Sequence, residues 1–202
     1  MITQQNCPIV YNNNDNNQIR ALLPPLGKTW DNPTAIIRVL KKKIRTQLDE
    51  VQFYCAYCGL ELGGTSAGEI DHIAPKASNK HPEFTYTATN LVLACNFCNG
   101  PKKKFQQETV NVKNTNYNSC TFLIVHPYFD NPNTHYSWID NANRIIIQSM
   151  SNKGTATIAM FELDSPRMTR FRAIEYNIYI TENNLILDDE TEQQLKAALK
   201  YK

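Results

Sequence analysis

The segment EIDHIAPK, residues 69–76, lies between two Cys-x2-Cys pairs, and this arrangement is the strongest indication of the fold. The first pair is Cys55 and Cys58, the second is Cys95 and Cys98, and 36 residues separate them. A knuckle turn with this spacing points two thiolates at one ion, and two knuckles complete the tetrahedral four-cysteine site of structural zinc. Four thiolates leave no position for substrate, so we expect this zinc to stabilise the fold. Unligated buried cysteines or a redox pair are the alternative.

Length and composition suit one compact domain with additions. The chain has 202 residues, of which 42% are hydrophobic and 20% charged, and its net charge is +2. This balance excludes a histone-like polybasic protein but does not exclude nucleic-acid binding, because local charge matters more than the sum. Apolar runs fall short of the ~20 residues of a membrane helix, and the polar N-terminus lacks the features of a signal peptide. We therefore expect a cytoplasmic protein without membrane contact.

Hydrophobic spacing and turn residues predict the elements around the cysteine frame. A basic helix is expected from residue 33 to 51, capped by Asp31 or Asn32, with short strands at 69–73 and 91–94 and a short helix near Asn99. The polar face of the first helix is either solvated or contacts phosphate; it carries Arg38, Lys41, Lys42, Lys43 and Arg45.

The segments before and after this core are expected to differ in secondary structure. Residues 1–32 look irregular because they are rich in Asn, Pro and Gly. Strands are predicted at 121–125, 144–149 and 155–161, and helices at 163–180 and 188–202. The fold class is therefore α+β, divided into an N-terminal segment (1–32), a core with its leading helix (33–105) and an α+β extension packed on the core (106–202).

Four elements in this order resemble the HNH endonuclease family. They are the first Cys-x2-Cys pair, Asp71-His72-Ile73-x-Pro75, Asn90-Leu91, and the second pair followed by Asn99 and Lys102. The resemblance covers roughly residues 53–105. It implies a ββα-metal fold, in which a short hairpin and a helix surround one catalytic divalent ion, and it implies cleavage of DNA.

The resemblance also assigns roles by position. His72 would be the general base that activates water, Asp71 and Asn99 would be the metal ligands, and Asn90 would hold the loop and orient the base. Histidine often stands in the family where this chain has Asn99. A carboxylate with an amide oxygen suits Mg²⁺ or Mn²⁺, and a histidine with an ordinary pKa near ~6.5 can accept a proton at neutral pH.

Two further points concern the substrate side. Lys76, Lys102 and Lys103 are candidate phosphate contacts, with plain surface lysines as the alternative. Successive strand residues point to opposite faces, so Asp71 and His72 reach one phosphate only if a twist, a bulge or a strand end intervenes.

A second, weaker constellation lies at residues 126–135, where His126, Asp130 and His135 could bind metal or could simply satisfy a structured turn. This segment and the Arg-bearing helix after it resemble the tail of HNH components of anti-phage systems, including PtuB-like proteins that work beside an ATPase. This similarity implies an ATPase partner. The alternative function is a catalytically silent, zinc-stabilised subunit that binds nucleic acid or a partner.

Overall fold

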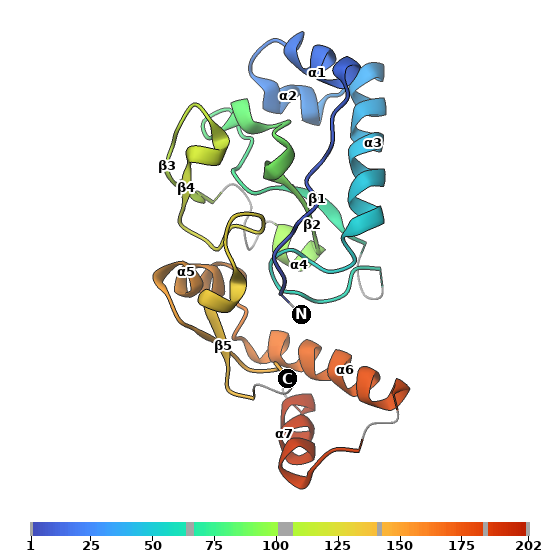
Figure 1. Cartoon of the computed structure of the whole chain (residues 1–202), viewed down its shortest axis with the longest axis vertical. Coiled ribbons are helices and arrows are strands. Elements are labelled where there is room, and N and C mark those ends of the chain that lie inside the picture. Colours follow the sequence, from blue (N-terminus) through green and yellow to red (C-terminus); the bar gives the residue numbers. More distant parts are fainter. Residues whose placement is uncertain (1, 64–66, 101–106, 141–142, 184–185, 201–202) are drawn as a thin grey trace.

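The computed structural model describes residues 2–63, 67–100, 107–140, 143–183 and 186–200. Figure 1 shows the N-terminal helices, the central hairpin and α4 in one part of the molecule, and the last three helices in the other. The helices are α1 (Asn13–Arg20), α2 (Leu26–Asp31), α3 (Ala35–Val51), α4 (Asn96–Asn99), α5 (Asn152–Phe161), α6 (Pro166–Glu182) and α7 (Asp189–Leu199). The strands are β1 (Glu69–His72), β2 (Leu91–Ala94), β3 (Val110–Val112), β4 (Thr121–Phe122), β5 (Tyr136–Trp138) and β6 (Ile147–Ser149).

The centre of the molecule is the antiparallel pair β1–β2. Asp71 lies opposite Val92, and His72 lies opposite Leu91. The one-turn helix α4 follows β2 and contacts both strands. Both strands were predicted within a residue of their observed bounds, because each is a short apolar or alternating run bounded by turn residues. The other strands in the described residues pair as two small antiparallel sheets, β3–β4 and β5–β6.

Helix α3 buries the predicted apolar face against this hairpin. Ile37, Leu40, Ile44 and Leu48 are its buried side chains, at the spacing of one helical face. The predicted cap was wrong by two or three residues. Thr34 is the cap, since its side chain accepts a hydrogen bond from the backbone N–H of Ile37.

The prediction that residues 1–32 are irregular was wrong, because they contain α1 and α2. Asn12 caps α1 in a reciprocal pair with Asp15, each side chain accepting a hydrogen bond from the other's backbone N–H. Asp15 is buried and forms an ion pair with Lys43 of α3. Asparagine disfavours helix interiors but is a strong cap, and the contact with α3 stabilises a helix that composition alone does not indicate.

A second correction concerns residues 155–161, which were predicted as a strand and form α5. Ser151 caps this helix through the backbone N–H of Gly154. Gly154 lies so close to the backbone of His135 that an added Cβ would be 2.2 Å from its carbonyl oxygen. The β-branched residues suggested a strand, but the cap and this tertiary contact favour the helix. The predicted strands 121–125 and 144–149 shrink to β4 and β6.

The predictions for the C-terminal helices were confirmed. Ser165 caps α6 with Pro166 at its first position, and Asp188 caps α7. One hydrophobic cluster joins Cys55 and Val92 of the core with Ile124, Phe161 and Met168 of the extension. The extension therefore shares its interior with the cysteine frame. No helix in the described ranges is long and apolar enough to cross a membrane.

Candidate active site and metal centre

The four cysteines of the two pairs converge on one point. Their sulfur atoms lie within 4.8 Å of one another, all four residues are buried, and Cys58 Sγ is 3.8 Å from Cys95 Sγ. Tetrahedral Zn–S bonds of about 2.3 Å would place neighbouring sulfurs roughly 3.8 Å apart, so the arrangement fits zinc. Hydrogen bonds from the neighbouring thiols, that of Cys55 first, lower the pKa of Cys95, while the corresponding contacts raise the pKa of Cys58 and Cys98. Thiolate is the form that binds the metal.

Backbone hydrogen bonds hold the first knuckle against the hairpin. The N–H of Gly59 donates to Cys55 O at 3.0 Å, and Gly59 has the positive φ of 71° that glycine tolerates. The N–H of Ala56 donates to Leu93 O of β2 at 3.0 Å. The zinc site therefore ties the knuckle to the strand that leads to α4.

Asp71 and His72 point to opposite faces of β1, as strand alternation requires. Asp71 faces the knuckle, where it accepts a hydrogen bond from the hydroxyl of Tyr57. His72, the last residue of the strand, faces α2. Its Nε2 lies 3.1 Å from the carbonyl oxygen of Thr85, and its ring meets Trp30 edge-on at 4.6 Å between centroids. Only 5% of His72 is exposed.

Asn90 braces the loop that connects the two strands. Its Oδ1 accepts a hydrogen bond from the N–H of Ala74 at 2.6 Å, and its Nδ2 donates to Phe84 O at 2.9 Å. Its own carbonyl accepts the N–H of Ile73, the residue after His72. Asn90 is completely buried. These bonds define the position of the backbone immediately beyond His72.

The extension contributes two residues to this brace: Tyr117, which sequence reasoning missed, and His126, which it named only as a possible metal ligand. The hydroxyl of Tyr117 donates to Asn90 Oδ1 at 2.8 Å and lies 3.0 Å from Nε2 of His126. Nδ1 of His126 accepts the N–H groups of Tyr128 and Phe129, so Nε2 carries the proton and donates to Tyr117. Burial lowers the pKa of His126 to about 3, which keeps the ring neutral. No motif in the sequence indicates this chain of hydrogen bonds.

Asn99 lies at the end of α4 beside β1. Its Nδ2 donates to Oε2 of Glu69 at 2.8 Å. Glu69 is two residues before Asp71 and therefore shares its strand face. Sequence reasoning assigned no role to Glu69, although this spacing is a signal that could have found it. The structure thus gathers Glu69, Asp71 and Asn99 on the knuckle side of the hairpin.

Cationic side chains lie on the His72 side. Lys76 forms an ion pair with Asp31 at 2.6 Å. Lys41 of α3 donates to Trp30 O at 3.0 Å, and its ammonium lies 4.7 Å from the centre of the Trp30 ring. Lys102 and Lys103, the other predicted phosphate contacts, lie outside the described residues. Trp30 therefore connects this positive edge to the histidine.

The constellation at residues 126–135 forms a satisfied turn. Asp130 accepts the N–H of His126 at 2.8 Å and pairs with Lys153 at 2.7 Å, while His135 Nδ1 lies 2.7 Å from Ser151 Oγ. Among the described residues, the cysteines are the one group of three or more His, Cys, Asp or Glu side chains that could hold a metal. These contacts therefore support a structural role for residues 126–135 rather than metal binding.

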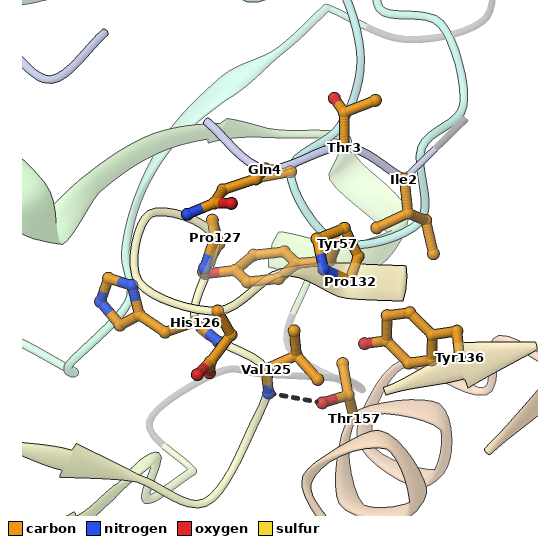
Figure 2. A pocket seen from close by; sticks show the side chains of 12 residues that line it. Ile2, Thr3, Gln4, Tyr57, Val125, His126, Pro127, Pro132, Tyr136 and Thr157 are labelled. Atoms are coloured by element: carbon orange, nitrogen blue, oxygen red, sulfur yellow. Dashed lines mark hydrogen bonds between the residues drawn. The ribbon is translucent and has the colours of Figure 1, made fainter. Parts of the chain in front are cut away.

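Behind the Asp71–Tyr57 pair, the start of the chain closes a small pocket. Figure 2 shows Ile2, Thr3 and Gln4 lying over Tyr57, with Tyr136 from β5 on another wall. Gln4 and Gln5 donate hydrogen bonds to the backbone carbonyls of Tyr128 and Pro127. The N-terminal segment therefore joins the knuckle to the extension.

Comparison with known proteins gives one match. Residues 55–105 match the family model described as HNH endonuclease. No curated protein and no solved structure matches the chain. The matched range contains both cysteine pairs together with Asp71, His72 and Asn90, and it ends shortly after Asn99. Residues 55–105 therefore form an HNH endonuclease domain, which carries the four-cysteine zinc site.

Proposed function

We propose that the protein is a metal-dependent endonuclease that hydrolyses phosphodiester bonds of DNA, with His72 as the general base. The main support for this proposal is the contact between the His72 ring and the carbonyl oxygen of Thr85. A proton on Nε2 donated to Thr85 O would leave the lone pair on Nδ1, which is the form that accepts a proton from water. The loop bonds of Asn90 hold the backbone on either side of this contact.

Asp71 and Asn99 would hold the catalytic divalent ion. A carboxylate and an amide oxygen are hard donors that suit Mg²⁺ or Mn²⁺. Because Asn99 directs its Nδ2 to Glu69, its Oδ1 is the end of the amide that remains for a cation. When bound, such an ion neutralises phosphate charge and stabilises the leaving oxygen. Lys76, Lys102 and Lys103 are the proposed contacts to the DNA backbone.

We further propose an anti-phage role beside an ATPase partner in the cytoplasm. Its support is the resemblance of residues 126–135, residues 154–158 and the Arg-bearing helix that follows to the tails of HNH components of such systems. The near-neutral net charge of +2 also favours a partner, because a nuclease acting alone on DNA gains affinity from a basic surplus.

A catalytically silent binding subunit is the second candidate function. It is favoured by the burial of His72 beneath Trp30 and by the orientation of Asp71 toward the opposite face. In this conformation the proposed base and the proposed ligand do not face one space. Catalysis would need Asp71 to turn toward His72, and a partner could supply that change.

Cleavage of supercoiled plasmid separates the two functions. The zinc-loaded chain is assayed with Mg²⁺ or Mn²⁺ and with neither ion added, since a strong chelator would also remove zinc. His72→Ala is expected to lose about 100-fold or more of the activity. His135→Ala is the matched control, because it removes a histidine of the satisfied turn, and it should keep the nuclease activity. Absence of cleavage by the folded wild-type protein would favour the silent subunit.

A further inference from the structure

A groove beside the zinc knuckle contains two buried polar atoms without partners. It is lined by the first knuckle, by the loop after β5 and by α6. Among the described residues, Nη1 of Arg172 and Oδ1 of Asn143 are buried without a hydrogen-bond partner. Each residue is only 8% exposed, and both line the groove. Buried donors and acceptors are nearly always satisfied, so this pair indicates an occupant.

The rest of Arg172 is firmly placed. Its Nε donates to Ile145 O and its Nη2 donates to Leu163 O, both at 2.6 Å. Its guanidinium lies 5.6 Å from the centre of the Trp138 ring. Burial lowers the pKa of Arg172 to about 10, so it remains charged at neutral pH. The unused Nη1 is therefore a fixed, charged donor.

The exposed part of the groove has the character of a protein interface. Tyr54, Ile178 and Tyr179 are large apolar side chains that are 46%, 50% and 54% exposed. Apolar residues lie on both sides of α6, while its described neighbour α7 packs along part of it (Figure 1). Met168 and Ala173 of α6 pack in two hydrophobic clusters of this chain, whereas Ile178 and Tyr179 belong to neither cluster and remain exposed.

The charged side chains that line the groove indicate which class of molecule binds there. The accessible lining carries three carboxylates, those of Glu61, Glu175 and Glu182, and one half-buried cation, Arg144, so its net charge is negative. A nucleic-acid strand would bring phosphates against these carboxylates. A peptide unit offers one C=O and one N–H. The C=O would be the missing acceptor for Arg172 Nη1, and the N–H would be the missing donor for Asn143 Oδ1. A basic side chain next to that unit would complement the rim.

We propose that this groove binds a basic peptide segment of a partner protein. One peptide unit accepts a hydrogen bond from Arg172 Nη1 and donates to Asn143 Oδ1. An adjacent Lys or Arg side chain lies against Glu61 and Glu182, and apolar neighbours pack on Tyr54 and Tyr179. Because Cys58 and Gly59 also line the groove, the bound segment contacts the zinc knuckle. This docking does not depend on nuclease activity.

The two tryptophans of the chain allow a direct test. Trp138 lines the groove, and Trp30 lies in α2 beside His72. The probe is acetyl-Ala-Leu-Arg-Leu-Ala-amide, titrated into the zinc-loaded, ¹⁵N-labelled full chain. We expect a saturable shift of the indole N–H signal of Trp138 and none for Trp30. The analogue with Glu in place of Arg should bind much more weakly.

Substitutions of exposed side chains at the rim of the groove should not disturb folding, so they test binding alone. Glu182→Gln should weaken binding of the basic peptide about two- to fivefold. Glu50→Gln, an exposed glutamate of α3, should leave it unchanged. An unmoved Trp138 signal would overturn the proposal, as would equal binding of the acidic analogue. A shift of Trp138 by oligo(dT) but not by the peptide would instead identify a base-binding pocket.

Discussion

The indole of Trp30 lies edge-on against the imidazole of His72, with ring centroids 4.6 Å apart and planes at 87°. Trp30 is itself 7% exposed and is covered by the ammonium of Lys41. The proposed base is thus held between a backbone carbonyl on one side and a helix from the N-terminal segment on the other. This contact makes α2 part of the candidate active site.

Trp30→Leu should lower the rate of DNA cleavage while leaving the protein folded. Leucine preserves an apolar contact but removes the ring that restrains His72, and loss of orientation is expected to reduce kcat by about tenfold. Trp30→Phe keeps an aromatic edge and should retain most of the rate. Steady-state cleavage of plasmid with Mg²⁺ measures kcat and KM for both variants.

An orientation effect should appear in kcat and leave the KM for plasmid nearly unchanged. If Trp30→Leu instead cleaves faster than the wild type, α2 covers the base and restrains access. The proposed positioning role would then be wrong, and an inhibitory one would replace it.

Burial of His126 should make stability depend on pH. Its pKa falls from 6.5 in the unfolded chain to about 3 in the folded protein, because burial disfavours the charged ring. The unfolded chain therefore binds a proton below pH 6.5 that the folded protein excludes. Above pH 6.5 His126 therefore does not lower the free energy of unfolding. As the pH falls from 6.5 toward 3, proton binding to the unfolded chain lowers this free energy progressively. At pH 5.5 the loss from this residue should be about 1.4 kcal/mol.

Urea unfolding at pH 7.5 and 5.5 measures this loss. In His126→Gln the free energy of unfolding should be lower at pH 7.5 and should change less between the two pH values. Zinc content is followed in parallel, since protonation of the cysteines would also destabilise the protein. Equal pH slopes for both proteins would contradict the assignment.

Much of the core could be predicted from residues close in sequence. The cysteine spacing, the alternating run at β1 and the helical period of α3 each depend on local pattern, and the structure confirms these elements. The contacts around Asn90 could not be predicted in this way. Tyr117, which bonds Asn90, and His126, which bonds Tyr117, lie 27 and 36 positions after Asn90 in the chain, so only the fold brings them together.

The two segments assigned to the wrong kind of structure share one physical cause, which is a tertiary contact that overrides local propensity. Residues 12–17 are mostly asparagine, yet α1 forms because Asp15 pairs with Lys43 of α3. Residues 155–161 contain β-branched side chains, yet α5 forms because Gly154 fits closely against His135. Both helices begin at a side-chain cap, Asn12 and Ser151, which was the local signal available.

Cys55→Ser should lose zinc and much of its stability. Zinc binding contributes folding free energy, because the four thiolates are gathered only in the folded chain. We expect Tm to fall by at least about 10 °C, which corresponds to about 4 kcal/mol for a chain of this size. Cys7→Ser is the matched control, since Cys7 is exposed and lies away from the cluster. Full thermal stability in a zinc-free Cys55→Ser protein would exclude a structural role for the metal.

Glu69→Leu should raise the concentration of Mg²⁺ needed for cleavage. Glu69 accepts the hydrogen bond from Asn99 Nδ2 and so directs Asn99 Oδ1 away from itself. Without that acceptor the amide can rotate, and the proposed ion loses an oriented ligand. Glu69→Gln keeps an acceptor oxygen and should restore much of the affinity. Glu50→Leu, an exposed glutamate on α3, is the control for the change of charge and polarity.

The readout is the Mg²⁺ concentration at half-maximal cleavage rate, which a general loss of stability would not shift. We expect an increase of roughly tenfold or more for Glu69→Leu, the range typical for residues that orient a metal ligand. Saturating Mg²⁺ should then recover most of the maximal rate. A lower maximal rate at unchanged half-saturation would assign Glu69 a role apart from Asn99 and the ion.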